Sequence, residues 1–139
     1  MEINIFYEEI EVFNLHDNLQ AWIDEAIKNE HLQTGEINII FCSDDYLLKM
    51  NKEHLEHDYY TDIITFDYCE NGIVSGDLFI SKDRVGENAK EFNVKFNDEI
   101  NRVVIHGVLH LVGYNDKTDD EQTIMTEKEN QYLEYVKTS

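Results

Sequence analysis

The chain has 139 residues, 42% of them hydrophobic, which is the length of one ordinary domain with enough apolar side chains to bury a core. Its 30 acidic and 11 basic residues give a formal net charge of −19, which opposes loose adhesion to nucleic acid or to anionic membranes. Two distant cysteines, Cys42 and Cys69, and the lack of any apolar run near the roughly 18 residues of a membrane span favour a reduced, cytoplasmic protein.

The first half of the chain alternates predicted strands and helices. Apolar residues on one face of residues 2–8 predict a half-buried strand. Helical spacing then predicts an amphipathic helix that is capped by Asp17 and ends near Gly35. A β-branched and aromatic run predicts a second strand at about 36–42, and a helix over 44–55 begins with two acidic residues.

The second half begins with two more predicted strands, 61–68 and 73–81. Between them, the Glu-Asn-Gly segment at 70–72 is suited to a turn that joins the strands as a hairpin. A helix is predicted around 82–93. Because these residues carry no proline and no repeat, nothing marks a domain boundary here.

The helix predicted over 97–112 has the clearest limits in the chain. Asn97 is a natural N-cap, and Gly113 is suited to end the helix as a C′ glycine. Apolar residues cover most of its faces, which predicts a central, buried helix. A last helix begins at a capping box that is formed by Thr118 and Glu121.

The predicted element order is therefore β, α, β, α, β, β, α, α, α. Four strands and five helices in one uninterrupted sequence favour a single α+β domain over residues 1–139.

Two histidines and an aspartate form the strongest candidate site. His106 and His110 lie at i and i+4 in the predicted central helix, so two ring nitrogens can converge on one ion. Gly113 allows a sharp turn, after which Asp116 can return as an oxygen ligand. Three ligands leave one position of a zinc ion open, as in catalytic sites. The alternative is a pair of core histidines and a solvated loop acid, and Asn115 is a competing ligand.

The spacing HxxxHxxGxxD is similar to the metzincin pattern HExxHxxGxxH, with two differences. A carboxylate takes the place of the third histidine, and zinc accepts carboxylate oxygens at about 2.0–2.2 Å. Gly107 stands where metalloproteases have the glutamate that acts as general base. Peptide hydrolysis is therefore not expected.

Other residues have weaker patterns. His54 and His57 with Asp58 stand near a helix end, where surface histidines are the more ordinary interpretation. Asp77, inside an apolar strand, is a candidate to orient a ligand histidine through its second ring nitrogen; the alternative is an edge-strand or turn acid. Asp62 is a strand-start carboxylate that binds backbone amides, or a further residue of the site.

The segment "HGVLHLVGYND" resembles the HGxLHLxGYDH signature of the YbeY family of bacterial endoribonucleases and rRNA maturation factors. Three further segments resemble family motifs in the same order. "MNKEHLEHDYYTDIITF" is similar to LNxxyRxxDxPTDVLSF, "GDLFIS" to GDIxIS, and "MTEKE" to a trailing MxxxE.

This resemblance implies a small α+β domain with a mixed sheet of about four strands, packed with about five helices that include a zincin-like metal helix. It implies one zinc ion per chain, or another divalent metal, at His106, His110 and Asp116. The implied activity is metal-dependent cleavage of single-stranded RNA, in maturation of the small-subunit rRNA 3′ end and in ribosome quality control. RNA and the ribosome or its proteins are the implied partners, and neither DNA nor a membrane is expected.

The sequence departs from the family pattern at three places. The third histidine falls on Asp116, and oxygen in place of nitrogen makes the site less soft. The family arginine falls on Leu55, which removes a guanidinium that can hold a phosphate with two hydrogen bonds. The proline before "TD" is Tyr60. Positive charge near the substrate must then come from another residue, and the candidates are Lys52, Arg84 and Arg102.

Two further functions agree with the same residues. One is a ribosome-associated binding factor whose metal is purely structural, and the other is a metal-dependent hydrolase of another phosphoester or of an amide. The first predicts that loss of His110 unfolds the domain, whereas a catalytic site predicts lost cleavage with the fold retained.

Overall fold

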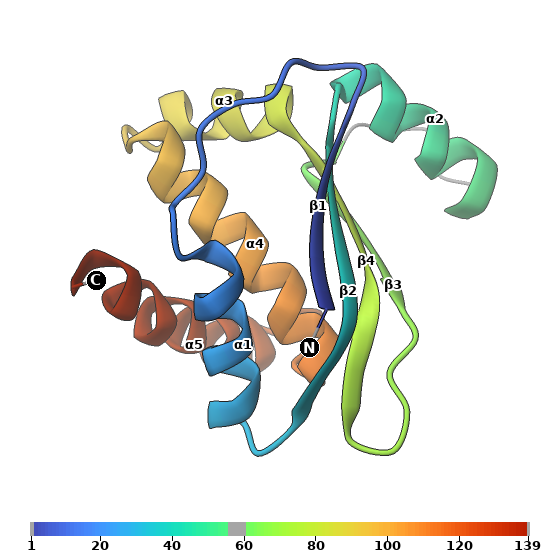
Figure 1. Cartoon of the computed structure of the whole chain (residues 1–139). Helices are drawn as coiled ribbons and strands as arrows, with labels where there is room; N and C mark the ends of the chain where they lie inside the picture. Colours follow the sequence, from blue (N-terminus) through green and yellow to red (C-terminus); the bar gives the residue numbers. More distant parts are fainter. Residues whose placement is uncertain (1, 56–60, 139) are drawn as a thin grey trace.

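Four strands and five helices follow one another in the predicted order along the described part of the chain (Figure 1). The computed structural model describes residues 2–55 and 61–138, so the interpretations of His57, Asp58 and Tyr60 lie outside it. The strands are β1 (Glu2–Glu8), β2 (Gln33–Cys42), β3 (Ile63–Asp67) and β4 (Ile73–Ser81). The helices are α1 (Leu19–Asn29), α2 (Asp44–Leu55), α3 (Lys82–Glu91), α4 (Phe96–Val112) and α5 (Asp119–Thr138).

The strands form one mixed sheet in the order β1-β2-β4-β3. β2 pairs in parallel with both β1 and β4, whereas β3 pairs with β4 in the antiparallel direction. The predicted hairpin between β3 and β4 is confirmed. Asn71 and Gly72 both have positive φ, 52° and 77°, the backbone conformation that a two-residue hairpin turn requires.

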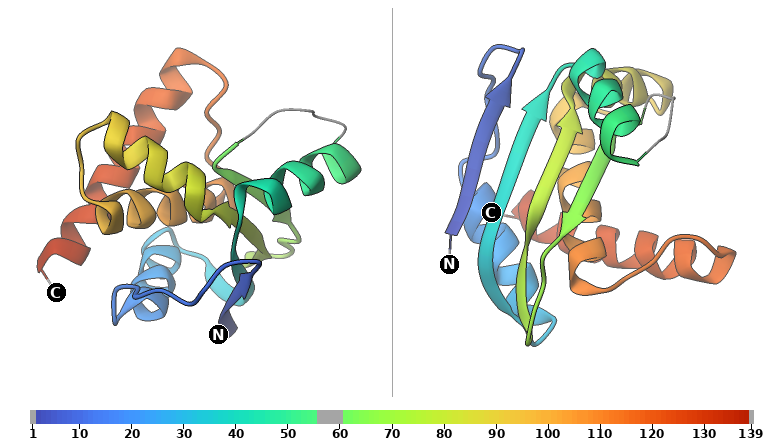
Figure 2. Two further views of the ribbon diagram at one scale, coloured as in Figure 1. Left: turned by 90° about the horizontal axis from the view of Figure 1, so that it is seen from above. Right: turned by 90° about the vertical axis from the view of Figure 1, so that its right-hand side faces the viewer.

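The helices divide unequally between the two faces of the sheet. α1, α3, α4 and α5 cover one face, and α2 lies against one end of the other (Figures 1 and 2). The larger hydrophobic core lies between the sheet and the four helices, and a smaller cluster around Leu47 and Ile64 lies under α2. Within residues 2–55 and 61–138, no helix combines the length and the apolar sequence needed to cross a lipid bilayer.

α4 is the central helix, as its apolar faces predict. Ten of its residues are buried, from Glu99 to Leu111. At Gly107 the helix approaches the sheet closely, because a Cβ atom there would lie 2.7 Å from Cδ1 of Ile63 and 3.1 Å from Cδ2 of Leu78. The face that carries His106 and His110 remains partly exposed.

Both predicted limits of the first helix are wrong. α1 follows Asn18, which makes no side-chain cap, rather than Asp17. The helix ends at Asn29, and His31 turns the chain with a φ of 66°. Gly35 instead lies inside β2 beside a register irregularity, where a Cβ atom would lie 2.3 Å from Oγ of Ser75. This glycine therefore marks close strand packing and not a helix end.

The limits of the last two helices are mostly as predicted. α4 begins at Phe96, so Asn97 lies in its first turn and is not the N-cap. Gly113 ends the helix with a φ of 127°, as predicted. Thr118 and Glu121 form the predicted capping box, in which each backbone N–H donates to the other side chain at 3.0 and 3.1 Å.

Gly76 gives a direct test of the packing between α4 and the sheet. A Cβ atom at this residue would lie 2.4 Å from the carbonyl oxygen of Phe66 and 2.8 Å from Cδ2 of Leu111. We expect Gly76→Ala to lower the free energy of unfolding by about 1–3 kcal/mol, measured by urea denaturation.

The matched control is Gly86→Ala in α3. There an added Cβ atom meets only Cε2 of Phe96, at 3.8 Å, so alanine should raise the free energy of unfolding by up to about 1 kcal/mol. Equal stability of the two variants would contradict the described packing.

Candidate metal centre

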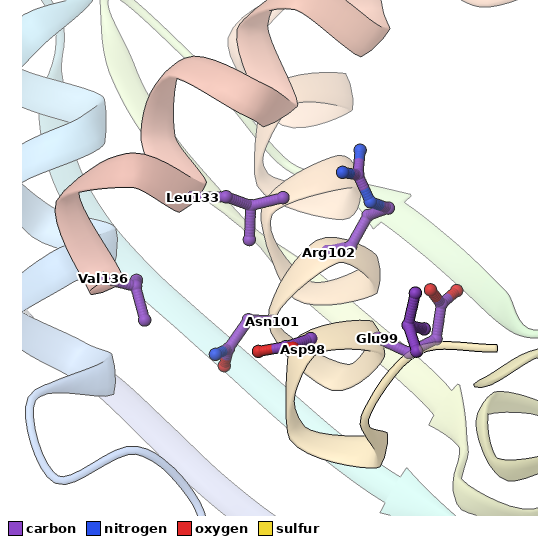
Figure 3. A pocket seen from close by; sticks show the side chains of 7 residues that line it. Asp98, Glu99, Asn101, Arg102, Leu133 and Val136 are labelled. Atoms are coloured by element: carbon purple, nitrogen blue, oxygen red, sulfur yellow. The ribbon is translucent and has the colours of Figure 1, made fainter. Parts of the chain in front are cut away.

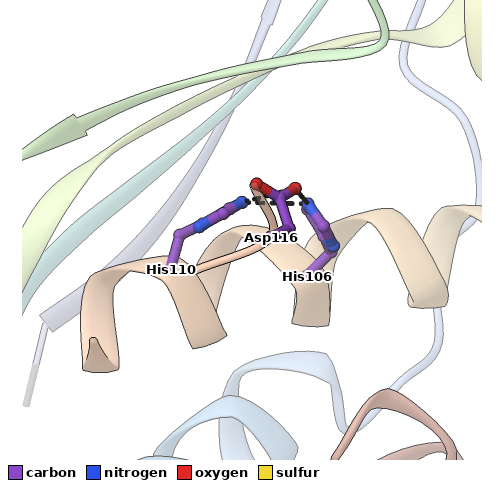
Figure 4. Close-up of side chains that lie close together, drawn as sticks. All are labelled: His106, His110 and Asp116. Atoms are coloured by element: carbon purple, nitrogen blue, oxygen red, sulfur yellow. Dashed lines mark hydrogen bonds and ion pairs between the residues drawn. The ribbon is translucent and has the colours of Figure 1, made fainter. Parts of the chain in front are cut away.

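The side chains of His106, His110 and Asp116 point toward one another (Figure 4). The Nε2 atoms of the two histidines are 3.0 Å apart. Oδ2 of Asp116 lies 3.3 Å from each of them. Among the described residues, this is the only group of three or more histidine, cysteine or acidic side chains placed to share an ion.

The dimensions of this triangle fit a tetrahedral metal ion. Two ligand atoms about 2.0–2.1 Å from a tetrahedral zinc ion stand roughly 3.3 Å apart. The three edges here are 3.0, 3.3 and 3.3 Å. Two imidazole nitrogens and a carboxylate oxygen are also a donor set that zinc and other divalent ions accept.

Each histidine is held by its other ring nitrogen. Nδ1 of His106 lies 2.6 Å from Oε2 of Glu129, a carboxylate on α5 that accepts the Nδ1 proton. Nδ1 of His110 lies 3.0 Å from the backbone carbonyl oxygen of Tyr114, which also only accepts. With both Nδ1 protons bound in this way, both Nε2 lone pairs face the centre of the triangle.

Glu129 also connects the centre to a guanidinium. Its second oxygen, Oε1, accepts a hydrogen bond from Nη1 of Arg102 at 2.8 Å. Burial alone would lower the pKa of His106, but the hydrogen bond and charge of Glu129, with the charge of Asp116, raise it. Glu129 therefore favours an electron-rich imidazole at this position.

Glu129 is a residue of the site that the HxxxHxxGxxD pattern does not include. It lies 23 positions after His106 and reaches it only because α5 packs on α4. A signal was present, since Glu129 is the last residue of the "MTEKE" segment that resembles the family's MxxxE.

Asp62 lies beside the centre. With Glu99, Arg102, Val103, His106 and Glu129 it lines a cavity of about 120 Å³. Burial raises the pKa of Asp62, while the charge of His106 and hydrogen bonds from the backbone amides of Asp62 and Ile63 act against this shift. Both interpretations of Asp62 thus have support, because it binds backbone amides and also faces the site cavity.

A second cavity adjoins the one that Asp62 lines. It lies between the start of α4 and the end of α5 (Figure 3). Glu99 and Arg102 line both cavities. Arg102 is thus the candidate cation that the fold brings beside the centre. Arg84 instead pairs with Asp44 at the start of α2, 2.7 Å away.

The candidate role of Asp77 in orienting a ligand histidine is wrong, and so is the alternative of an edge-strand or turn acid, because Asp77 lies within β4, an inner strand of the sheet. Leu78 faces α4 at Gly107, so its neighbour Asp77 points to the opposite face of the sheet. There it accepts a hydrogen bond from Nδ2 of Asn38 at 3.0 Å. The ring nitrogens that it was expected to bind are held by Glu129 and by the carbonyl group of Tyr114.

The position after the first histidine cannot carry a general base. A side chain at Gly107 would enter the contact with Ile63 and Leu78. The structure thus gives a steric reason for the missing metalloprotease glutamate: this position packs the helix on the sheet.

The fold and the site define a small α+β domain in which one buried helix and the turn after it bring two histidines and a carboxylate together. A family model described as Endoribonuclease YbeY matches residues 2–137. The chain belongs to the YbeY family.

Individual relatives agree with this assignment. A Christiangramia forsetii protein named Endoribonuclease YbeY is 48% identical over 132 residues, which cover 95% of this chain and 92% of the relative. A Bacteroides thetaiotaomicron protein of the same name is 52% identical over 112 residues, 81% of this chain and 82% of the relative. The solution structure of a Thermotoga maritima protein is 35% identical, has a TM-score of 0.72, and is matched over 96% of this chain and 88% of that chain.

The contact between Glu129 and His106 gives a second prediction. We expect Glu129→Gln to weaken zinc binding about 10–100-fold, because an amide holds the imidazole without the negative charge. The affinity is measured by competition with a chromophoric chelator. Glu127→Gln is the control, since Glu127 is exposed on the same helix and the variant has the same net charge. Equal affinities of the two variants would show that Glu129 does not support the metal.

Proposed function

We propose that this protein is a metal-dependent endoribonuclease that cleaves single-stranded RNA, with one zinc ion held by His106, His110 and Asp116. Its membership of the Endoribonuclease YbeY family supports the nuclease activity. The observation that carries the metal dependence is the triangle of two imidazole nitrogens and one carboxylate oxygen, with edges of 3.0 to 3.3 Å.

The exposure of the three side chains favours a catalytic metal over a structural one. They are 25%, 26% and 40% exposed, whereas the ligands of a structural zinc ion normally close the site on all sides. When bound, the metal would polarise a phosphate oxygen and lower the pKa of water. Glu129 and the carbonyl group of Tyr114 hold the two imidazoles, and Arg102 brings positive charge to the cavity beside them.

We further propose that this domain, over residues 1–139, acts in the cytoplasm on rRNA. The proposed tasks are maturation of the small-subunit rRNA 3′ end and ribosome quality control, with the ribosome or its proteins as partners. The net charge of −19 supports a role for such partners, because the chain itself attracts RNA poorly.

Metal analysis and cleavage assays test this function together. We expect about one zinc ion per chain in protein purified without a histidine tag. We expect cleavage of single-stranded RNA, and neither of DNA nor of peptides. His110→Ala and Asp116→Ala should abolish cleavage while the far-UV circular dichroism spectrum is retained.

Other results would favour the alternatives. Unfolding of His110→Ala would favour a structural metal in a binding factor. Cleavage of a different substrate would favour another hydrolase, and unchanged cleavage by Asp116→Ala would exclude the proposed centre.

RNA binding gives a further prediction. We expect weak binding of naked single-stranded RNA that falls about tenfold or more between about 50 and 200 mM salt, because local positive charge must act within an acidic protein. Fluorescence anisotropy of a labelled RNA measures it. Tight binding that salt does not change would contradict this expectation.

A further inference from the structure

We propose that Glu30, at the end of α1, is a positioning residue for the metal centre, acting through Tyr114. The proposal rests on the proposed function only in taking His106, His110 and Asp116 as metal ligands. Glu30 lies 84 positions before Tyr114, and nothing in the HxxxHxxGxxD pattern points to it.

Three donors converge on the carboxylate of Glu30. The hydroxyl of Tyr114 donates to Oε1 at 2.6 Å. The hydroxyl of Tyr132 and the ammonium group of Lys128, the latter at 3.2 Å, donate to Oε2. The side chain of Glu30 is only 10% exposed. A largely buried carboxylate is costly unless such partners compensate its charge, so this cluster constrains all four side chains.

The position of Glu30 at the end of α1 gives no reason for a negatively charged side chain there. The residue is the C-cap of α1, where the helix dipole disfavours negative charge. The next residue, His31, already leaves the helix with a positive φ. The groups that stabilise the carboxylate of Glu30 are instead Tyr114, in the loop after α4, and two residues of α5.

Tyr114 transmits this constraint to the centre. Its ring is bound at the hydroxyl by Glu30, and the ammonium group of Lys128 lies 5.6 Å from the ring centroid. Its backbone carbonyl accepts the hydrogen bond from Nδ1 of His110 at 3.0 Å. Tyr114 also follows the turn at Gly113 and precedes Asp116 by two residues. Holding Tyr114 in place therefore fixes the orientation of the His110 ring and the position from which the chain leads to Asp116.

A merely structural role would predict something different. The same cluster ties α1 to α5, since Nε1 of Trp22 also donates to the carbonyl oxygen of Tyr132 at 2.9 Å. If Glu30 only joined these helices, its loss would lower the stability of the metal-free and the metal-bound protein equally. Positioning predicts an additional loss of metal affinity.

The experiment compares Glu30→Gln and Tyr114→Phe with wild-type protein and with Asp24→Asn. Asp24 is the matched control, because it also lies on α1 and pairs with Lys28 at 2.8 Å within the same helix. Zinc affinity is measured by chelator competition, and the melting temperature is measured with and without zinc. The visible spectrum of the cobalt-substituted protein reports the geometry of the ligands.

We expect Glu30→Gln and Tyr114→Phe each to weaken zinc binding by about tenfold, the lower end of the range for groups that orient metal ligands. The rise in melting temperature on adding zinc should shrink in both. The double variant should lose less affinity than the product of the two single losses, because both act through one contact. Asp24→Asn should keep the wild-type affinity and cobalt spectrum.

Unchanged zinc affinity and an unchanged cobalt spectrum in Glu30→Gln would overturn the proposal, whatever its melting temperature. Tyr114→Phe removes one hydroxyl group and keeps the ring, so it provides the same test if Glu30→Gln does not fold. Wild-type protein that binds zinc but does not cleave RNA would overturn the proposed function and leave this inference standing. Wild-type protein that binds no zinc would overturn both.

Discussion

The burial of α4 against the sheet is the constraint on which both the fold and the site depend. Its apolar faces supply much of the larger core, and Gly107 allows the helix to approach Ile63 and Leu78 without an intervening side chain. Because the buried faces fix the rotation of the helix, they also fix the direction in which His106 and His110 point. A site built on such a helix is held more rigidly than one built on loops, and only Asp116 depends on a turn for its position.

Charge around the centre explains how an acidic protein can act on a polyanion. Asp116 and Glu129 contact the histidines, and Asp62 and Glu99 line the adjoining cavity. These carboxylates favour a divalent cation and disfavour a free phosphate. Among the residues lining that cavity, Arg102 is the only permanent cation, and its guanidinium is bound to Glu129 and Asn130. The proposed metal would therefore supply most of the attraction for a phosphate group, and the proposed partner proteins would supply the rest.

Local patterns in the sequence predicted the element order, the hairpin, the capping box and the three side chains that meet at the centre. Each depends on residues only a few positions apart, such as the i, i+4 pair of histidines and the turn at Gly113. The groups that hold these side chains in place come from elements far away in the sequence, so local patterns did not predict them. Glu129 reaches His106 from α5, and Glu30 reaches Tyr114 from α1. Asp77 failed as a candidate because its face depends on how the strand is placed against α4, which alternation within one strand does not determine.

The packing at Gly107 also limits which residues can take part in proton transfer at the site. In metalloproteases with the HExxH pattern, the general base is on the same helix as the two histidines. Here that position is filled by the contact between the helix and the sheet, so proton transfer cannot use a side chain from it. The groups that remain beside His106 come from other elements or other turns: Asp62 before β3, Glu129 on α5 and Arg102 one turn earlier on α4. Similar ligand spacing therefore supports different chemistry, because the residue between the ligands packs the core in this fold.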